Sequence, residues 1–251
     1  MRHLLSSVLA PCLTMCLALL FAFQLQAQTL SSDNNNDGCV NLDDLLNVLS
    51  EYGLCSAFEC GVQVPHDGYY YSTVQIGDQC WFSENCRYLP EVSPSSEGSE
   101  TDPYYYVYDY QGTDVEAAKA TLNYLTYGVL YNWPAVMTGD ICPSGWHSPS
   151  DEEFTELTDF LGGESVAGGK MKSHFAWYND GNGTNSSVFT GLPGGYRSSG
   201  GFYSGGFSGL WWSASESGSY SWSRELNYYV DDVYRNGSLR YSGFSARCVR
   251  D

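Results

Sequence analysis

A twelve-residue stretch near the N-terminus has the residue types and spacing of a calcium-binding loop. Calcium prefers about six to eight oxygen ligands, and a loop of the EF-hand type supplies them from alternate positions. Side-chain oxygens, with one backbone carbonyl from the cysteine, fall on these positions: Asp33, Asn35, Asp37, Cys39, Asn41 and Asp44. Gly38 stands where the chain must turn sharply. The stretch therefore predicts a calcium site; the alternative is a solvated linker rich in Asn and Asp.

The residues after this loop predict the helix that would hold it in place. Its apolar face consists of Leu45, Leu46, Val48 and Leu49. Loop and helix together resemble a dockerin-type EF-hand repeat. Dockerins pair two such repeats, whereas this chain has one, and Asp44 replaces the Glu that ends a general EF-hand loop. The resemblance implies a small, calcium-stabilised, EF-hand-like helical segment over residues 28–54.

Residues 1–27 have the organisation of a secretory signal peptide. Arg2 gives a basic start, residues 4–25 are largely apolar, and Ala27 is the small residue after which a signal peptidase would cut. A membrane anchor is the alternative, but Pro11 interrupts the apolar run and no basic cluster follows it. We therefore expect an exported protein, secreted or held in the periplasm or at the cell surface, with no membrane span after cleavage.

Charge and cysteine content agree with a location outside the cell. The chain has 29 acidic and 11 basic residues and a formal charge of −18. Such a surface repels phosphate backbones, which argues against a nucleic-acid partner. Two of the nine cysteines fall in the predicted signal peptide, so an odd number remains. Most of these are expected to form disulfides in an oxidising compartment, with one thiol left over or paired elsewhere.

Composition divides the rest of the chain into a cysteine-bearing linker over residues 55–65 and a large domain over residues 66–251. The large domain is rich in Gly, Ser, Tyr and Trp and has few long apolar runs, which favours short strands and many turns. We predict a strand over residues 69–76, a turn at Gly77, and a returning strand over residues 79–82.

Two stretches of the large domain have helical spacing. Residues 115–125 carry apolar side chains at helical intervals. Ser150 and Glu153 form a capping box, because each can satisfy a backbone N–H at the start of a helix, and Gly162 ends that helix. The pattern predicts an α+β fold with about two helices and a loop-rich antiparallel sheet.

Six blocks of the large domain, taken together, form a recognisable sequence pattern. They are residues 71–85, 127–133, 141–147, 189–197, 211–215 and 244–250. In this order they resemble the Fibrobacter succinogenes major paralogous domain, a bacterial family, over about residues 60–251. That family is similar to the C-type-lectin-like fold, so the resemblance implies such a fold here. The family has no established general activity, and the resemblance therefore predicts a fold rather than a reaction.

The resemblance also implies a disulfide between Cys142 and Cys248, which would tie the start of the main helix to the last strand. A second bridge is expected between Cys60 and Cys80, with a Cys80–Cys86 bridge as the competing pair. The partners of the other cysteines stay open at this point.

A binding surface is predicted within residues 196–241, which are dense in aromatic, small polar and Arg side chains. This composition is typical of antibody-like binding surfaces, where rigid aromatic rings supply area and small polar groups adapt. Two aromatic residues of the family blocks, Tyr196 and Trp211, are expected in the core. The residues expected to contact a ligand are Tyr203, Trp222, Tyr228, Tyr229, Tyr234 and Arg235.

Candidate catalytic groups are few in the sequence. His147 follows a tryptophan of a family block and is interpreted as structural. Glu216, Glu225, Asp231 and Asp232 could supply the carboxylate pair of a glycosidase. With 29 acidic residues in the chain, chance pairs are expected, and surface solvation is the favoured interpretation. No nucleophile elbow or zinc-protease helix motif is present in the sequence.

These observations favour a secreted, non-catalytic recognition module for a glycan or a cell-surface protein, with a calcium-stabilised N-terminal segment. A hydrolase acting on extracellular polysaccharide, or an accessory subunit of one, is the alternative from a different class. A structural adhesin or surface component is the third possibility. Binding without turnover would separate the first hypothesis from the second.

Overall fold

The computed structural model describes residues 58–250, and the predicted signal peptide and calcium loop lie outside the described residues. The described strands are β1 (Val64–His66), β2 (Tyr69–Tyr71), β3 (Thr73–Ile76), β4 (Gln79–Phe82), β5 (Tyr105–Tyr106), β6 (Leu130–Tyr131), β7 (Tyr196–Ser198), β8 (Gly201–Tyr203), β9 (Ser208–Ser217), β10 (Tyr220–Asn227), β11 (Val233–Ser238) and β12 (Val249–Arg250). The described α-helices are α3 (Val115–Lys119), α4 (Leu122–Tyr127), α5 (Trp133–Val136), α6 (Asp151–Phe160) and α7 (Glu164–Met171).

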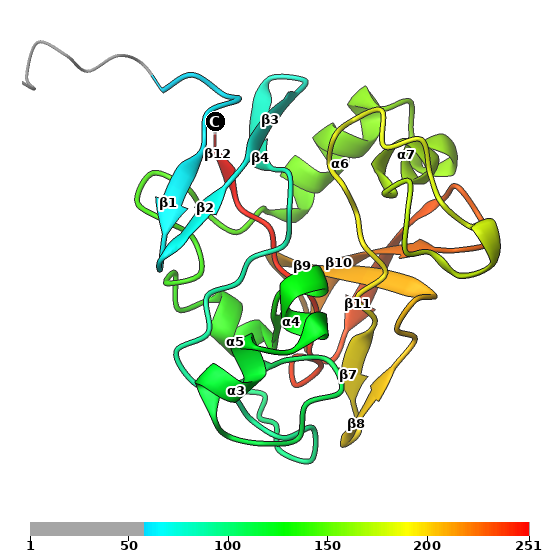
Figure 1. Ribbon diagram of the computed structural model, residues 1–251. Helices are drawn as coiled ribbons and strands as arrows, with labels where there is room; N and C mark the ends of the chain where they lie inside the picture. The colour runs from blue at the N-terminus through cyan, green and yellow to red at the C-terminus, as the bar shows by residue number, and fades with distance from the viewer. Residues whose placement is uncertain (1–57, 251) are drawn as a thin grey trace, which may run out of the picture. The chain divides into compact units, whose positions relative to one another are not determined.

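The paired strands are antiparallel, as the sequence predicted, but they form several small sheets. In the largest, β10 lies between β9 and β11. In a second, β4 lies between β3 and the last strand, β12, and this pairing brings the end of the described chain beside its beginning (Figure 1). The strand predicted over residues 69–76 is divided, because β2 pairs with β1 whereas β3 pairs with β4.

The described chain has five α-helices, whereas the sequence predicted about two. The helix expected over residues 115–125 is two short helices, because the side chain of Thr121 accepts a hydrogen bond from the backbone N–H of Tyr124 and starts α4 anew. Leu122 and Leu125 are 80% and 58% exposed, so the expected inward apolar stripe does not form. The sequence pattern therefore identified helical residues here but not the face that they bury.

Helix α6 begins at the predicted capping box. Ser150 Oγ accepts a hydrogen bond from the Glu153 backbone at 3.1 Å, and the Glu153 carboxylate accepts one from the Ser150 backbone at 2.6 Å. His147 Nε2 lies 2.6 Å from the other Glu153 oxygen. Burial would raise the pKa of Glu153, but hydrogen bonds from Ser150 and His147 outweigh burial and hold that pKa below its ordinary value. His147 thus contacts the start of α6, as expected of a structural residue.

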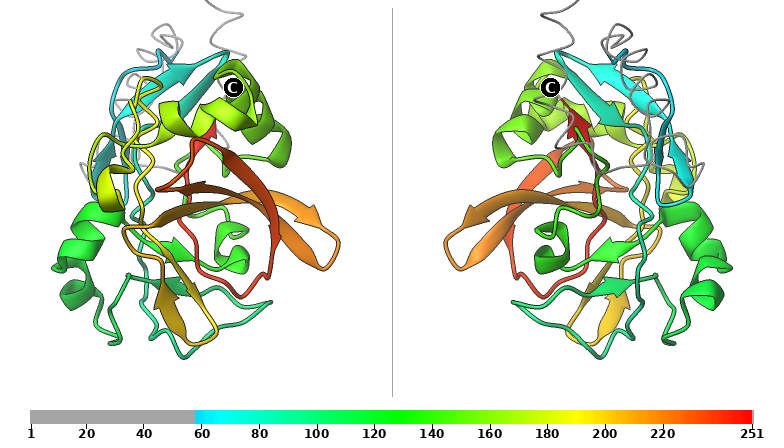
Figure 2. Two further views of the ribbon diagram at one scale, coloured as in Figure 1. Left: turned by 90° about the vertical axis from the view of Figure 1, so that its right-hand side faces the viewer. Right: turned by 90° about the vertical axis from the view of Figure 1, so that its left-hand side faces the viewer.

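The main core lies between helices α6 and α7 and one face of the β9–β10–β11 sheet. It includes Trp81, Phe154, Trp211 and Leu226, all fully buried. In the two views of Figure 2 the orange-to-red strands cross the middle of the described unit, and the yellow-green helices α6 and α7 lie above them. Burial of large aromatic side chains contributes most of the apolar area that such a core removes from water.

Two disulfides brace the fold. Cys142 is bonded to Cys248, the pair implied by the family resemblance, and Cys60 is bonded to Cys80. The competing Cys80–Cys86 bridge is not formed, and Cys86 is a buried free thiol. Of the described cysteines, Cys86 is therefore the one without a disulfide partner. The described chain contains no helix long and apolar enough to span a membrane.

A buried arginine joins segments that are far apart in the sequence. Arg247 donates from Nε to Asn85 Oδ1 at 3.0 Å, from Nη1 to the Phe82 carbonyl at 2.8 Å and from Nη2 to the Thr190 carbonyl at 3.1 Å. Its side chain is fully buried, and this burial lowers its pKa to about 9. The carbonyl and amide oxygens replace the water that the guanidinium loses, so this cation fixes β4, the 189–190 turn and the last strand together.

Candidate functional site

The central sheet presents two chemically different faces, because side chains alternate along each strand. Leu226 on β10 belongs to the buried core, and Arg224 on the same face contacts α6. Glu225 lies between them in sequence and points to the opposite face, where it lines an open pocket. The pocket thus lies under the sheet, on the side away from α6 and α7.

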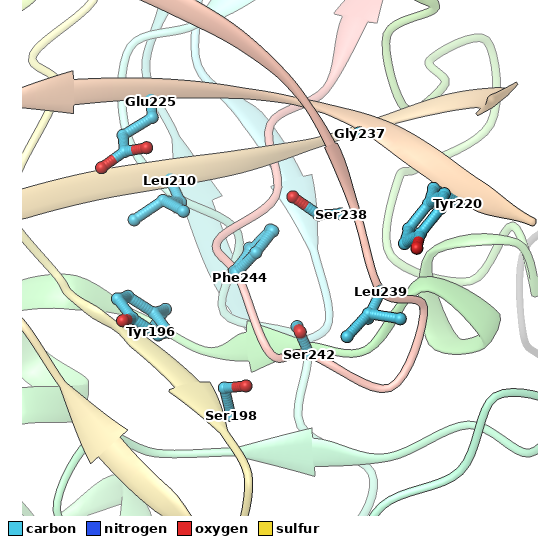
Figure 3. Close-up of a pocket in the computed structure, with 10 residues that line it drawn as sticks. All are labelled: Tyr196, Ser198, Leu210, Tyr220, Glu225, Gly237, Ser238, Leu239, Ser242 and Phe244. Carbon is cyan, nitrogen blue, oxygen red and sulfur yellow. The ribbon is translucent and has the colours of Figure 1, made fainter.

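The pocket has a volume of about 370 Å³, within the range of small-molecule sites. Figure 3 shows β10 and β11 crossing over it, with Glu225 near one end and Tyr220 near the other. Strand β7 and the segment before β12 supply its other sides. The lining residues are Tyr196, Ser198, Leu210, Tyr220, Glu225, Gly237, Ser238, Leu239, Ser242 and Phe244.

Two amide side chains hold the Glu225 carboxylate in position. Asn227 Nδ2 donates to Glu225 Oε1 at 3.2 Å, and Asn236 Nδ2 donates to Oε2 at 3.1 Å. Ser208 in turn donates to Asn227 Oδ1 at 2.7 Å, which fixes the orientation of that amide. A carboxylate has about four lone-pair positions, so each oxygen retains capacity for a ligand donor. The arrangement presents an oriented, preorganised acceptor to the pocket.

Aromatic and hydroxyl groups complete the lining. Tyr196 stacks against Tyr203 with ring centroids 5.6 Å apart and meets Phe244 edge-on at 6.2 Å. Tyr220 is exposed at the other end. Ser238 Oγ lies 3.0 Å from Ser223 Oγ, which links the hydroxyls of neighbouring strands. Apolar rings, hydroxyls and one fixed carboxylate match the mixed polar and apolar surface of a sugar ring.

The six residues predicted to contact a ligand differ in their exposure and in their position relative to the pocket. Tyr203, Tyr229 and Tyr234 are exposed, as a ligand contact requires, whereas Trp222 and Tyr228 are partly buried. Tyr203 reaches the pocket through its stack on Tyr196, and Tyr234 is the cross-strand neighbour of Glu225. None of the predicted six lines the pocket itself.

Arg235 already has a partner within the protein. It donates to the Asp151 carboxylate from Nη2 at 2.6 Å and from Nε at 2.9 Å. Arg224 Nη1 donates to the same carboxylate at 2.7 Å. The Arg235 guanidinium also lies 3.5 Å from the Trp222 ring centroid. These contacts place Arg235 and Trp222 over α6, on the sheet face away from the pocket.

Asp151 is the charged centre of that second face. Burial would raise its pKa, but the hydrogen bonds from Arg235 and Arg224 outweigh burial and hold that pKa below its ordinary value. The carboxylate stays ionised and joins β10 and β11 to the first turn of α6. Its place at the start of the helix is also favourable for a negative charge.

Three residues that line the pocket were not predicted from the sequence as ligand contacts. Tyr196 was expected in the core, but it is partly exposed and lines the pocket; Trp211 is buried as expected. Glu225 was considered only as a member of a chance carboxylate pair, and Tyr220 was counted within the aromatic stretch 196–241 but not among the expected ligand contacts. The available signal was the alternation along β10, which places Glu225 on the face opposite Leu226.

The predicted calcium ligands Asp33, Asn35, Asp37, Cys39, Asn41 and Asp44 lie outside the described residues. Within residues 58–250 no group of three or more His, Cys, Asp or Glu side chains is arranged to hold a metal ion. The sequence therefore remains the basis for the calcium prediction.

Comparison with known protein families gives one match. The model of the Fibrobacter succinogenes major domain matches residues 74–250, which is more than half of the chain. No curated protein and no solved structure gives a significant match.

Proposed function

The chain belongs to the Fibrobacter succinogenes major domain family, and on that premise we propose that it is an exported binding module whose pocket takes a neutral glycan. The observation that carries the proposal is the pocket built around Glu225, with its two amide partners and its aromatic ends. Sugar hydroxyls donate well to a fixed carboxylate, and tyrosine rings cover the apolar face of a pyranose.

Binding is favoured over hydrolysis by the composition of the pocket. Glycoside hydrolysis ordinarily uses two carboxyl groups on opposite sides of the scissile bond, about 5 to 10 Å apart. Glu225 is the one carboxylate among the described lining residues. A negatively charged pocket on a chain of formal charge −18 also disfavours uronates and sulfated sugars. The ligand class that fits best is therefore a neutral glycan.

The proposed function includes a location outside the cytoplasm and a C-type-lectin-like fold. The predicted signal peptide and the two disulfides support a location in an oxidising compartment, secreted or at the cell surface. The α+β architecture with many loops, together with the Cys142–Cys248 bridge near the last strand, supports the proposed C-type-lectin-like fold for residues 66–251. Residues 55–65 would then connect it to the N-terminal segment.

We also propose that residues 28–54 form a dockerin-like segment that binds calcium through the loop from Asp33 to Asp44. A ligand that binds only the folded state raises its stability by an amount that grows with the logarithm of one plus the ligand concentration over Kd. Calcium should therefore raise the melting temperature of the segment, and chelator should reverse the change. An Asp33→Ala/Asp37→Ala variant should lose the response, and an equal response in that variant would contradict the site.

A glycan array tests the main proposal. Wild-type protein should retain neutral glycans without releasing shorter products, and Glu225→Gln should weaken retention by at least about tenfold, because the charged acceptor is lost. Glu91→Gln, an exposed carboxylate outside the pocket, is the matched control. Repeating the array with chelator separates the pocket from the calcium loop.

Each result of that array has a defined consequence. Release of oligosaccharides by wild type but not by Glu225→Gln would replace the proposal with the hydrolase alternative. Failure of every glycan to bind would contradict glycan recognition and favour a surface-protein partner or a structural adhesin role.

A further inference from the structure

Four aromatic side chains from three segments form a cluster beyond the Glu225 end of the pocket. Tyr178 stacks on Phe207 with centroids 4.5 Å apart, and Tyr228 stands edge-on to each of them at 5.5 Å. Tyr229 meets Tyr228 edge-on at 5.2 Å. Tyr178, Phe207 and Tyr229 are exposed, with Tyr229 the most accessible at 65%. We call these four residues the aromatic platform.

The aromatic platform is held in place by a buried lysine. Lys172, 2% exposed, donates from Nζ to the Val230 carbonyl at 2.7 Å and to the Asn227 carbonyl at 3.3 Å. The same ammonium lies 3.3 Å from an Asp231 oxygen. Because these contacts bracket Tyr228 and Tyr229, the lysine fixes the backbone that carries both rings. The platform is thus preorganised before any ligand arrives.

A second, more polar pocket of about 340 Å³ adjoins the platform. Tyr228 and Tyr229 line one part of it, and Asp180, Asn182 and Asp231 supply oxygen acceptors. Tyrosine rings beside a carboxylate are common to both pockets. The second pocket therefore suits the same class of ligand.

The two pockets are linked along the sheet. Tyr234 is the cross-strand neighbour of Glu225, and its pKa is raised by desolvation and by the nearby Tyr229. Tyr228 follows Glu225 by three residues, and three residues of extended chain span about 10 Å. The Glu225 end of the first pocket and the aromatic platform therefore lie at the same end of the β10–β11 hairpin.

We infer that the protein binds an extended glycan chain, with one part in the Glu225 pocket and the next part on the aromatic platform. This inference rests on the proposed function and adds the ligand's length and direction. The Glu225 pocket fixes a sugar through its carboxylate, whereas the platform supplies stacking area that a short ligand does not reach. A longer chain makes the second set of contacts while its first sugar is already bound. This tethering raises the effective concentration of the later sugars at the aromatic platform.

Affinity measured against chain length tests the inference. The probes are neutral cello-, xylo- and chito-oligosaccharides, from the disaccharide to the hexasaccharide, titrated by calorimetry into the full exported chain. Wild type should bind the hexasaccharide at least about tenfold more tightly than the disaccharide in the series that it recognises. The Tyr178→Ala/Tyr229→Ala variant should lose most of this gain and keep the disaccharide affinity.

Matched variants separate this inference from the proposed function. Tyr70→Ala removes a similarly exposed tyrosine, 63% accessible on β2, and should leave the length dependence unchanged. Glu225→Gln should weaken the disaccharide and the hexasaccharide alike. If wild type binds both lengths equally and Glu225→Gln weakens both, the platform role is wrong and the pocket stands. If wild type binds no probe of any length, both are wrong.

Discussion

The thiol sulfur of Cys86 lies 3.5 Å from the Sγ of Cys248, although Cys248 is already bonded to Cys142. Three cysteines from distant parts of the chain therefore meet at one buried point. A thiol beside a disulfide sulfur is placed for exchange: its thiolate can bond to Cys248 while Cys142 leaves as the new thiolate and takes up a proton. The exchange needs no external oxidant.

The Cys142→Ser variant tests this geometry. When the variant is folded with glutathione disulfide as the oxidant, we expect Cys248 to form a disulfide with Cys86 instead, and the variant to unfold at a denaturant concentration close to that of wild type. The double variant Cys142→Ser/Cys86→Ser has no partner for Cys248 among these three, and it should lose about 4 kcal/mol, the contribution of a cross-link that closes a long loop. Peptide mapping without reduction identifies the bridge. A free Cys248 in the single variant would contradict the expectation.

Alkaline stability should depend on Cys86. Burial raises the pKa of this thiol from its ordinary value of 9.0 to about 12. The unfolded chain releases the proton at lower pH than the folded chain, so the stabilising effect is complete below about pH 9 and is lost as pH rises towards 12. Relative to Cys86→Ala, wild type should lose up to about 1.4 kcal/mol per pH unit in that window.

The measurement for Cys86 is the difference in unfolding free energy between the two proteins at several pH values. Tyr71 and Tyr131 are present in both proteins, so the effect of their own burial, which is the largest cause of their raised pKa values, is common to both. A difference that stays constant from pH 8 to pH 11 would show that the thiol is not buried as described.

Asp151 should contribute to stability at neutral pH more than a surface carboxylate does. Asp151→Asn leaves the buried Arg224 without its charged partner, and breaking such a pair costs about 3 kcal/mol or more. The Asp151 pKa is lowered in the folded state. Its contribution is therefore present above the unfolded pKa of about 3.9 and is lost as pH falls through the folded value.

Urea unfolding at neutral and at strongly acidic pH checks this expectation for Asp151. The difference between wild type and Asp151→Asn should be largest near pH 7 and should shrink in acid. Asp159→Asn changes an exposed carboxylate of the same helix and should have little effect at either pH. Equal costs for the two substitutions would contradict a special role for Asp151.

Gly181 allows the chain to pass close to Tyr228. A Cβ at residue 181 would stand 2.1 Å from the Tyr228 carbonyl oxygen, a backbone atom that cannot rotate away. Gly181→Ala should therefore destabilise the protein by roughly 1 to 3 kcal/mol and displace Tyr228 from the aromatic platform. Gly237→Ala is the control, because its nearest neighbours lie 3.6 Å from the added Cβ. Thermal unfolding of both variants gives the comparison.

Local sequence patterns predicted the features that depend on near neighbours. The capping box of Ser150 and Glu153 is confirmed, because its hydrogen bonds join residues three positions apart. The α+β class and antiparallel strands followed from turn residues and strand-forming stretches. The number of helices did not, because α3 and α4 divide at a cap that competes with a continuous helical pattern.

The Cys142–Cys248 bridge followed from the family resemblance, and the odd cysteine count predicted one thiol left over or paired elsewhere. That Cys86 is the free thiol among the described cysteines, and that it lies against Cys248, was decided by tertiary packing, since 162 positions separate the two residues. The composition of the candidate site also depended on tertiary structure. The sequence marked an aromatic, polar stretch, but strand register placed Glu225 over a pocket and Arg235 against Asp151. Composition determines which side chains a surface can offer; which face of a strand they occupy depends on pairing with residues far away in the chain.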